Sequence, residues 1–144
     1  MGLPDRNGIK QIDPRGLQAR LDEGEKLFLL DVRSAQEYAY DGHIAGSHLL
    51  PLPMLMQRAQ EMPSDMPIIC ICRSGNRSMT AAEQLLNLGY ENVVNLAGGM
   101  RDWIHLNCMS TLCPNRWHAA GDVRFHPDNI ITGGRETNII FILS

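Results

Sequence analysis

The sequence has no apolar window near the roughly 20 residues that a membrane-spanning helix needs. Its opening, MGLPDRNGIK, lacks the apolar core of a signal peptide. Four cysteines are too few for a secreted scaffold held together by disulfides, and a reducing compartment would keep them as thiols. We therefore expect a cytoplasmic protein with no membrane partner, whose cysteines serve chemistry rather than cross-linking.

Strong net charge, internal repeats and low-complexity tracts are also absent. The formal net charge is −3, with 20% charged and 44% hydrophobic residues, all near the values of globular chains. So small a net charge creates no strong field, and nucleic acid is not an expected partner. A chain of 144 residues has the length of one domain, which can bury a core without metal or disulfides.

The apolar pattern predicts strands and helices that alternate along the chain. Short apolar runs, typical of strands buried on both faces, are followed by helix starts and by helical spacing. We expect strands at 27–32, 68–71 and 92–96, and helices at 14–23, from 35, at 53–62, 78–88 and 100–106. Such alternation favours an α/β fold with a mostly parallel central sheet and helices on both faces. Ligands of such folds bind beyond the carboxyl ends of the strands.

Cys72 lies at such an end, in a polar loop between the strand Ile68–Ile71 and the next helix. The pKa of a cysteine thiol, about 8.5, falls to roughly 3.5–7.5 near cations or a helix N-terminus. Arg73 and Arg77 supply fixed charge, and Gly75 lets successive amides turn inward as an anion-binding nest. The loop therefore predicts a nucleophilic thiolate that receives an anionic substrate.

This interpretation requires Cys72 to be ionised at neutral pH and to face solvent. It does not extend to Cys70, which lies inside the apolar run with no adjacent cation. We expect Cys70 to pack in the core as a small hydrophobic residue.

Three stretches of the sequence together resemble the rhodanese family of sulfurtransferases. They are the loop of Cys72, the segment Asp31-Val32-Arg33 with Glu37 and Gly42–Ser47, and the segment Asn95–Met100 with Trp103. The resemblance implies a rhodanese-like α/β domain over residues 9–106. Residues 107–144 depart from the family pattern and form a C-terminal extension of unknown role.

The resemblance also implies an activity. A sulfurtransferase of this family would move a sulfane sulfur from thiosulfate or a persulfide donor to a thiol, cyanide or protein acceptor, through a persulfide on Cys72. Arg73 and Arg77 would attract the donor's oxyanion, while the loop amides would hold the terminal sulfur. The expected substrate-binding residues are Arg73, Ser74, Gly75, Asn76, Arg77 and Ser78. No cofactor and no metal is required.

Two other functions fit parts of the pattern. Cysteine phosphatases and arsenate reductases of related fold resemble it, but have one more residue between nucleophile and arginine than the four that separate Cys72 from Arg77. The smaller loop suits one sulfur atom better than a tetrahedral phosphate. A rhodanese-like domain can also be a non-catalytic binding or regulatory module, although such modules often lack the cysteine. Between enzyme and module lies a sulfur carrier, which passes its persulfide to another protein.

Asp31, Arg33, Glu37 and His43 invite a catalytic interpretation, and Trp103 a role in substrate recognition. Asp31, Arg33 and Glu37 flank a buried strand, where charges more often form a structural ion pair and a helix cap. His43 lies among glycines, which suggests a turn contact, and an already ionised thiol needs no general base. Trp103 is expected to anchor the last helix against the sheet.

The extension contains residues that could have separate roles. Cys108, Cys113 and His118, with His105 just before the extension, suggest zinc only weakly, because the cysteine spacing is not that of a usual zinc knuckle. Cys108 or Cys113 could also resolve the persulfide on Cys72. The run Asn138–Leu143 predicts a strand that joins the central sheet, pairs with a second chain in a homodimer, or is an aggregation liability.

Overall fold

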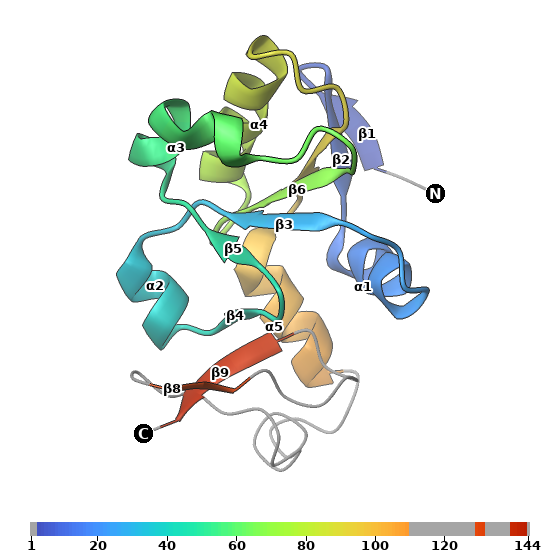
Figure 1. The fold of residues 1–144 in the computed structure, drawn as a ribbon. Helices are drawn as coiled ribbons and strands as arrows, with labels where there is room; N and C mark the ends of the chain where they lie inside the picture. Colours follow the sequence, from blue (N-terminus) through green and yellow to red (C-terminus); the bar gives the residue numbers. More distant parts are fainter. Residues whose placement is uncertain (1–2, 110–128, 132–138, 144) are drawn as a thin grey trace.

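The computed structural model describes residues 3–109, 129–131 and 139–143. A six-stranded sheet in the order β1-β2-β7-β6-β3-β5 forms its centre (Figure 1). The strands are β1 (Leu3–Arg6), β2 (Ile9–Ile12), β3 (Phe28–Asp31), β5 (His48–Leu49), β6 (Ile68–Ile71) and β7 (Val93–Leu96). Neighbouring strands run parallel except β1 and β2, which form an antiparallel hairpin. The predicted α/β fold with a mostly parallel sheet is confirmed.

Helices cover both faces of this sheet (Figure 1). On one face lie α1 (Pro14–Asp22) and α5 (Gly99–Met109); on the other lie α3 (Leu52–Arg58), the 3₁₀ turn η1 (Ala59–Glu61) and α4 (Asn76–Asn87). The short α2 (Ala35–Tyr40) follows β3 at its carboxyl end. The loop of Cys72 thus lies between the end of β6 and the start of α4.

Two helix starts form where the sequence predicts them. The Asp13 carboxylate accepts a hydrogen bond of 2.7 Å from the Gly16 amide and caps α1. Ser34 and Glu37 form a complete capping box at α2, each side chain satisfying the other residue's backbone amide. Because these caps need only residues three apart, the sequence alone is enough to place them.

The core has two parts, one on each face of the sheet. Along β6, the side chains of Ile68 and Cys70 join the cluster under α3 and α4, whereas those of Ile69 and Ile71 join the cluster under α1 and α5. All four are at most 1% exposed. Full burial of an aliphatic side chain contributes about 1.5–3 kcal/mol, so β6 and the loop that follows it rest on a rigid base.

Three elements differ from the prediction. The hairpin of β1 and β2, joined by Asn7 and Gly8 with φ of 53° and 77°, is not predicted by the apolar pattern. The segment 42–46, expected as a loop, contains the short strand β4 (His43–Ile44). The predicted terminal strand exists as β9 (Ile139–Leu143), but it does not join the central sheet; it pairs antiparallel with β4 and with β8 (Asn129–Ile131).

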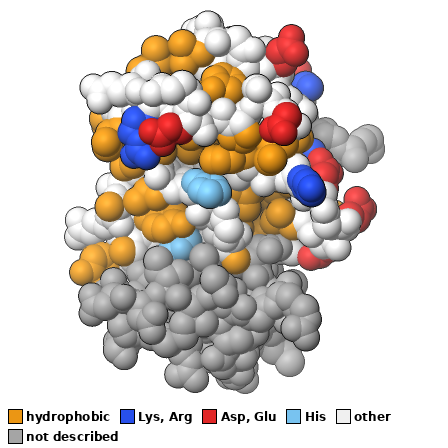
Figure 2. All heavy atoms as spheres, in the orientation of Figure 1, with side chains coloured by type: hydrophobic (Ala, Val, Ile, Leu, Met, Phe, Trp, Pro, Cys, Tyr) orange, Lys and Arg blue, Asp and Glu red, His pale blue; other side chains and the backbone are white. Residues whose placement is uncertain are grey.

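The surface shows mixed charge. On the face shown in Figure 2, the described Lys and Arg side chains are scattered among acidic ones and form no continuous basic area. None of the helices in the described part of the chain combines the length and the hydropathy needed to cross a membrane.

Candidate active site

The loop after β6 folds around the sulfur of Cys72. Gly75, with φ of +102°, occupies the position before α4 and donates its amide to the Cys72 Sγ at 3.0 Å. The Ser78 Oγ lies 3.3 Å from the same sulfur. A side chain at Gly75 would be strained by the positive φ, and its Cβ would lie 3.2 Å from the Gly98 amide nitrogen. Glycine at this position therefore lets the loop close on the sulfur.

The start of α5 holds the base of the loop. The Met100 and Arg101 amides donate to the carbonyls of Cys72 and Arg73 at 2.8 and 2.9 Å. A Cβ on Gly99 would lie 2.4 Å from the Cys72 carbonyl oxygen, closer than atoms can approach. The glycine therefore allows two otherwise free helix amides to fix the loop backbone.

The environment of the sulfur favours its ionised form. Burial by itself would raise the pKa of Cys72, but hydrogen bonds from the Ser78 hydroxyl and from the amides of Ser78, Gly75 and Ser74 outweigh it and lower the pKa below its usual value. The lowered pKa agrees with the prediction, and so does one of its two predicted causes, the inward-facing loop amides. The Ser78 hydroxyl adds to them, whereas the main causes do not include the predicted guanidinium charge.

The expectation that Cys72 faces solvent is wrong for this conformation. The residue is 1% exposed and belongs to the core cluster under α4. The inward-pointing amides draw the sulfur into the loop, and a residue with positive φ closes the loop above it. A substrate therefore reaches the sulfur only when the loop widens or the side chain turns outward.

Arg77 makes an ion pair that the sequence does not reveal. Its guanidinium donates two hydrogen bonds, of 2.7 and 2.8 Å, to the Glu37 carboxylate of α2. Arg77 holds the pKa of Glu37 down at about 2, and Glu37 raises the pKa of Arg77. Arg77 is thus engaged in joining α4 to α2, and is not a free cation beside the sulfur.

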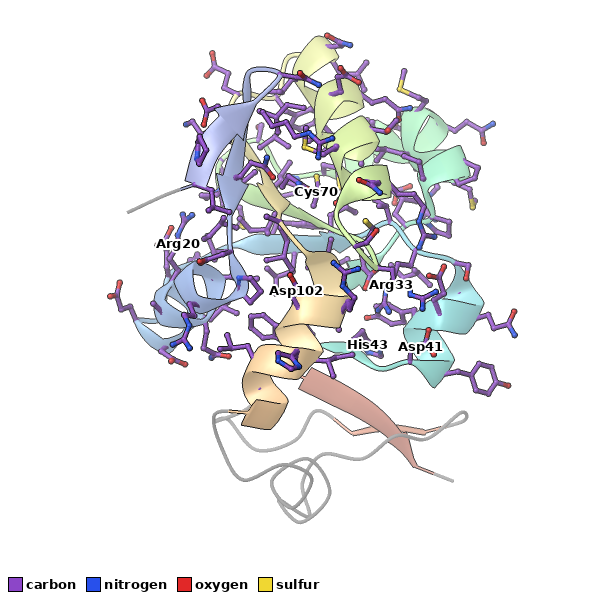
Figure 3. All side chains as sticks on the ribbon, turned by 180° about the vertical axis from the view of Figure 1, so that it is seen from behind. Arg20, Arg33, Asp41, His43, Cys70 and Asp102 are labelled. Carbon is purple, nitrogen blue, oxygen red and sulfur yellow. The ribbon has the colours of Figure 1, made fainter. Side chains whose placement is uncertain are left out.

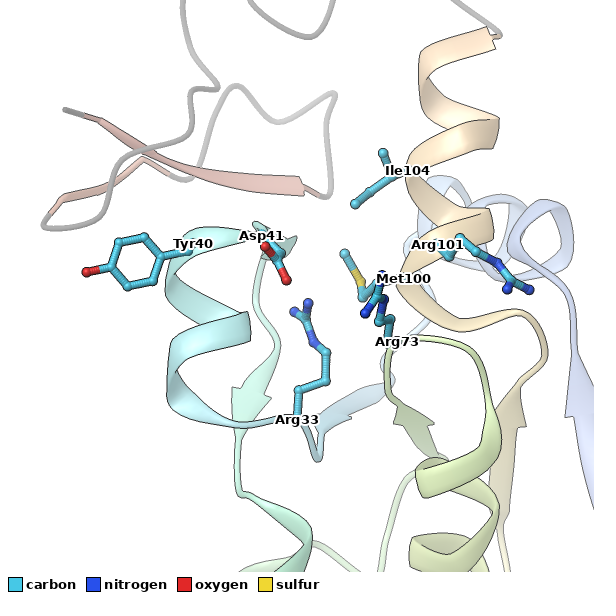
Figure 4. Close-up of a pocket in the computed structure, with 7 residues that line it drawn as sticks. All are labelled: Arg33, Tyr40, Asp41, Arg73, Met100, Arg101 and Ile104. Carbon is cyan, nitrogen blue, oxygen red and sulfur yellow. The ribbon is translucent and has the colours of Figure 1, made fainter.

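Arg73 is exposed and directed into a cavity of about 610 Å³ between α2 and α5 (Figure 4). Figure 4 shows Arg33 directed into the same cavity, whereas Tyr40 points away from it. The lining residues are Arg33, Tyr40, Asp41, Arg73, Met100, Arg101 and Ile104. Of the remaining loop residues, Ser74 is half-buried and Asn76 exposed.

Asp31 at the end of β3 and Arg33 just after it form a buried ion pair. The Arg33 guanidinium donates to the Asp31 carboxylate at 2.7 and 2.9 Å and to the Gly42 carbonyl at 2.9 Å. Asp31 and Arg33 are at most 1% exposed. The pair connects the end of β3 to the turn before β4, in keeping with the structural role expected for both residues (Figure 3).

His43, Cys70 and Trp103 are all fully buried (Figure 3 labels the first two). The His43 ring stacks on Tyr38 with centroids 3.4 Å apart, and burial lowers its pKa to about 4. Burial raises the pKa of Cys70 strongly. Trp103 packs in the cluster under α5. None of the three is hydrogen-bonded to the Cys72 sulfur, and their packing fits the roles expected from sequence.

The suggested zinc site is not tested, because Cys113, His118 and the side chain of Cys108 lie outside what the structure describes. Among the described residues, no group of three or more His, Cys, Asp or Glu side chains lies close enough together to hold a metal ion.

Two residues of the site, Asn95 and Gln11, are given no place beside Cys72 by the sequence analysis. The Asn95 amide on β7 lies 2.5 Å from the Ser78 hydroxyl, and it also bonds to the Gln11 amide on β2 at 2.8 Å. A polar residue within the apolar run 92–96 is the signal that could have singled out Asn95, because buried polar groups need partners. Gln11 lies on a strand that the sequence pattern did not predict.

Comparison with known proteins agrees with this geometry. The rhodanese-like domain family matches residues 13–106. A sulfurtransferase of Allochromatium vinosum is 37% identical over 95 residues, which cover 66% of this chain and 88% of that protein. The candidate sulfur carrier protein YrkF of Bacillus subtilis is 37% identical over 97 residues, but this chain spans only 52% of its length.

A solved structure shows the same fold. The crystal structure of a rhodanese-related protein from Thermoplasma volcanium superposes with a TM-score of 0.61 at 32% identity, covering 67% of this chain and 91% of the other. The family match extends over more than half of the chain and contains the Cys72 loop, the buried Asp31–Arg33 pair and the start of α5. The chain therefore belongs to the rhodanese-like domain family.

Proposed function

We propose that this protein is a sulfurtransferase that carries a sulfane sulfur on Cys72. In the first step the Cys72 thiolate attacks the outer sulfur of thiosulfate or a related donor. The sulfur–sulfur bond of the donor breaks, and sulfite leaves with the electron pair. In the second step a thiolate, cyanide or protein acceptor attacks the terminal sulfur of the persulfide, and the Cys72 thiolate is released for another cycle.

One observation carries this proposal: the Cys72 sulfur lies among hydrogen-bond donors, and within the described residues no histidine or carboxylate is hydrogen-bonded to it. The Gly75 amide at 3.0 Å and the Ser78 hydroxyl at 3.3 Å, with the amides of Ser74 and Ser78, lower the pKa of the thiol. The same donors are available to a persulfide anion, which bears its charge on the terminal sulfur. A nucleophile that is ionised without a base fits a reaction that transfers sulfur without moving a proton.

Access to the sulfur is part of the proposal. Because Cys72 is 1% exposed, the reaction needs an opening of the loop above it. Within the loop Arg73 is exposed and Ser74 half-buried, whereas Gly75 is buried and the Arg73 carbonyl is held by the Arg101 amide. Movement of Ser74 and Gly75 would connect the sulfur with the cavity that Arg73 lines.

Arg73 is the residue that we assign to the donor's oxyanion. Its side chain is directed into the cavity, and its guanidinium makes no hydrogen bond or ion pair with the described residues. Arg33 and Arg77 are each engaged by a carboxylate. A small anionic donor is therefore expected to enter from the cavity between α2 and α5, attracted by Arg73.

Steady-state kinetics with thiosulfate and cyanide test this assignment. Cys72→Ser should abolish turnover and leave the fold unchanged. Arg73→Gln should raise the KM for thiosulfate about tenfold or more, since a charge-assisted hydrogen bond contributes roughly 1.5–3 kcal/mol. Arg58→Gln is the matched control, because Arg58 carries the same charge on α3 and pairs with Glu61. An unchanged KM in Arg73→Gln would remove Arg73 from the donor site.

A sulfur carrier within a relay is the second candidate, favoured by the likeness to YrkF. In that case the persulfide on Cys72 forms rapidly, but its release to cyanide or small thiols is slow.

A phosphatase is disfavoured because the arginine that would clamp phosphate, Arg77, is held by Glu37. We expect a protein sample that transfers sulfur to show no hydrolysis of a phosphate ester. A cytoplasmic location and a homodimer remain predictions.

A further inference from the structure

A chain of polar side chains runs from the Cys72 sulfur across the sheet. The Ser78 hydroxyl lies 3.3 Å from the Cys72 Sγ and 2.5 Å from the Asn95 Oδ1, and the Asn95 Nδ2 lies 2.8 Å from the Gln11 Oε1. Gln11 and Asn95 are register partners on β2 and β7, and Asn95 is the partner of Cys70 on β6. Four side chains from three strands or strand ends and one helix thus form a continuous path.

This path is buried where it meets the sulfur and accessible at its far end. Cys72, Ser78 and Asn95 are each at most 1% exposed, whereas Gln11 is half-buried. The surrounding core cluster under α4 is apolar. An unpaired donor or acceptor in such surroundings costs about 1–3 kcal/mol, so each group in the path must find a partner in every state of the sulfur.

The hydroxyl of Ser78 has only one proton for two neighbours. When Cys72 is a thiol, its S–H can donate to the Ser78 oxygen, and the hydroxyl then donates to the Asn95 Oδ1. The Asn95 Nδ2 donates in turn to the Gln11 Oε1. Every donor in this state points away from the sulfur.

A thiolate reverses this order. The sulfur can only accept, so the Ser78 hydroxyl must donate to it, and the Asn95 Oδ1 loses its donor. If the Asn95 amide turns over, its NH₂ group donates to the Ser78 oxygen and its oxygen faces Gln11. Gln11 must turn over as well, so that its NH₂ group donates to Asn95. All groups are again satisfied, and every donor points toward the sulfur.

We propose that Asn95 and Gln11 are positioning residues for sulfur transfer, whose side-chain amides turn over together with the charge on the Cys72 sulfur and thereby set its ionisation. The proposal rests on the proposed function of Cys72. No covalent bond changes beyond the ionisation of the thiol; two amides rotate and one hydroxyl proton changes acceptor. Gln11, at the accessible end of the path, can be altered without touching the loop.

The substitution Gln11→Glu fixes the direction of the chain. A carboxylate can only accept, so it holds the Asn95 NH₂ group toward β2 and leaves the Asn95 oxygen facing Ser78. The Ser78 hydroxyl then keeps donating its hydrogen bond to the Asn95 oxygen, and the Cys72 thiolate receives no hydrogen bond from it. The pKa of Cys72 is expected to rise by about one unit, the effect of one hydrogen bond to a charged group.

Ultraviolet absorbance of the thiolate, titrated against pH, measures this shift without requiring access to the sulfur. Each variant is compared with the same variant carrying Cys72→Ser, so that the other cysteines and the tyrosines cancel. Lys10→Gln is the matched control: it changes the charge of the same strand by the same amount at an exposed position. It should shift the pKa of Cys72 by less than about 0.3 unit, because solvent screens its charge.

A double substitution separates the chain from simple repulsion. In the Asn95→Leu background the link is broken, and Gln11→Glu should no longer shift the pKa of Cys72; direct repulsion by the new carboxylate would persist. If Asn95→Leu does not fold, Ser78→Ala serves as the background, with the same expectation. Overlapping curves for Gln11→Glu and wild type, or a shift that survives both backgrounds, would overturn the proposal.

The other charged groups around Cys72 stay constant in these comparisons. They are Arg73, Arg77 with Glu37, Arg33 with Asp31, Arg101 with Asp102, and the thiol of Cys70. The titration also works in a protein that transfers no sulfur. If Gln11→Glu raises the pKa of Cys72 as expected but the protein transfers no sulfur, only the proposed sulfur transfer is refuted. If the protein transfers sulfur but Gln11→Glu leaves the pKa of Cys72 unchanged, only the proposed hydrogen-bonded path is refuted.

Discussion

Replacing Glu37 by glutamine should weaken the fold at neutral pH and leave it almost unchanged in acid. Glu37 caps α2 through Ser34 and binds Arg77 of α4 at 2.7 and 2.8 Å. It thus connects the two helices through residues that lie 40 positions apart in the sequence. Glutamine can keep the capping hydrogen bond to the Ser34 amide, because the capping box accepts Gln as well as Glu. The substitution therefore removes mainly the charge.

The pKa of Glu37 sets the size of the effect. It is lowered from 4.5 to about 2, chiefly by Arg77. The difference corresponds to an upper limit of roughly 3 kcal/mol, and solvent screening reduces it, since the Glu37 and Arg77 side chains are 24% and 40% exposed. We expect Glu37→Gln to lower the free energy of unfolding at pH 7 by about 1–2 kcal/mol.

The pH dependence follows from the sign of the shift. A carboxylate with a depressed pKa in the folded state stabilises the protein above its unfolded pKa, and this contribution is lost as the pH falls from about 4.5 toward 2. Urea unfolding of both proteins at several pH values from 7 to 2 measures it. Glu61→Gln is the control, because its ion pair with Arg58 is 43–47% exposed, and it should have no measurable effect. An unchanged stability of Glu37→Gln at pH 7 would refute the role of this ion pair.

Two further predictions concern the support of the site. Gly99→Ala should lower the free energy of unfolding by about 2–4 kcal/mol, because its Cβ would lie 2.4 Å from the Cys72 carbonyl oxygen. The control Gly24→Ala, with positive φ but open space around its Cβ, should lower it by about 1 kcal/mol. Equal losses for the two variants in thermal or urea unfolding would contradict the close packing at Gly99. Since burial lowers the pKa of His43 to about 4, stability should fall by about 2–4 kcal/mol as the pH decreases from 6.5 to 4, and His43→Gln should lack this loss. A His43→Gln variant with the same acid sensitivity as wild type would show that other groups cause it.

The sequence predicts well those parts of the molecule that local interactions determine. The caps at Asp13 and Ser34 and the buried strand of Ile68–Ile71 need only neighbouring residues or a continuous apolar run. The loop of Cys72 is predictable for the same reason, since nucleophile, glycine and helix start follow one another. The hairpin of β1 and β2 was missed, although Asn7-Gly8 with positive φ at both residues is a known hairpin signal.

Interactions between distant segments could not be predicted in this way. Nothing near Arg77 in the sequence indicates that its guanidinium binds Glu37 rather than a substrate. The link from Ser78 through Asn95 to Gln11 depends on the strand order β2-β7-β6, which places side chains 84 residues apart within hydrogen-bond distance. The burial of Cys72 also follows from tertiary packing, because α5 and α4 hold the loop from two sides.

Mass spectrometry of the intact protein after incubation with thiosulfate tests sulfur transfer most directly. Sulfur transfer through Cys72 requires a gain of one sulfur atom, which digestion locates on Cys72 and which cyanide or a thiol removes. The Cys72→Ser variant should gain nothing. Added sulfur on a different cysteine, or none on Cys72 while the protein is folded, would contradict the account.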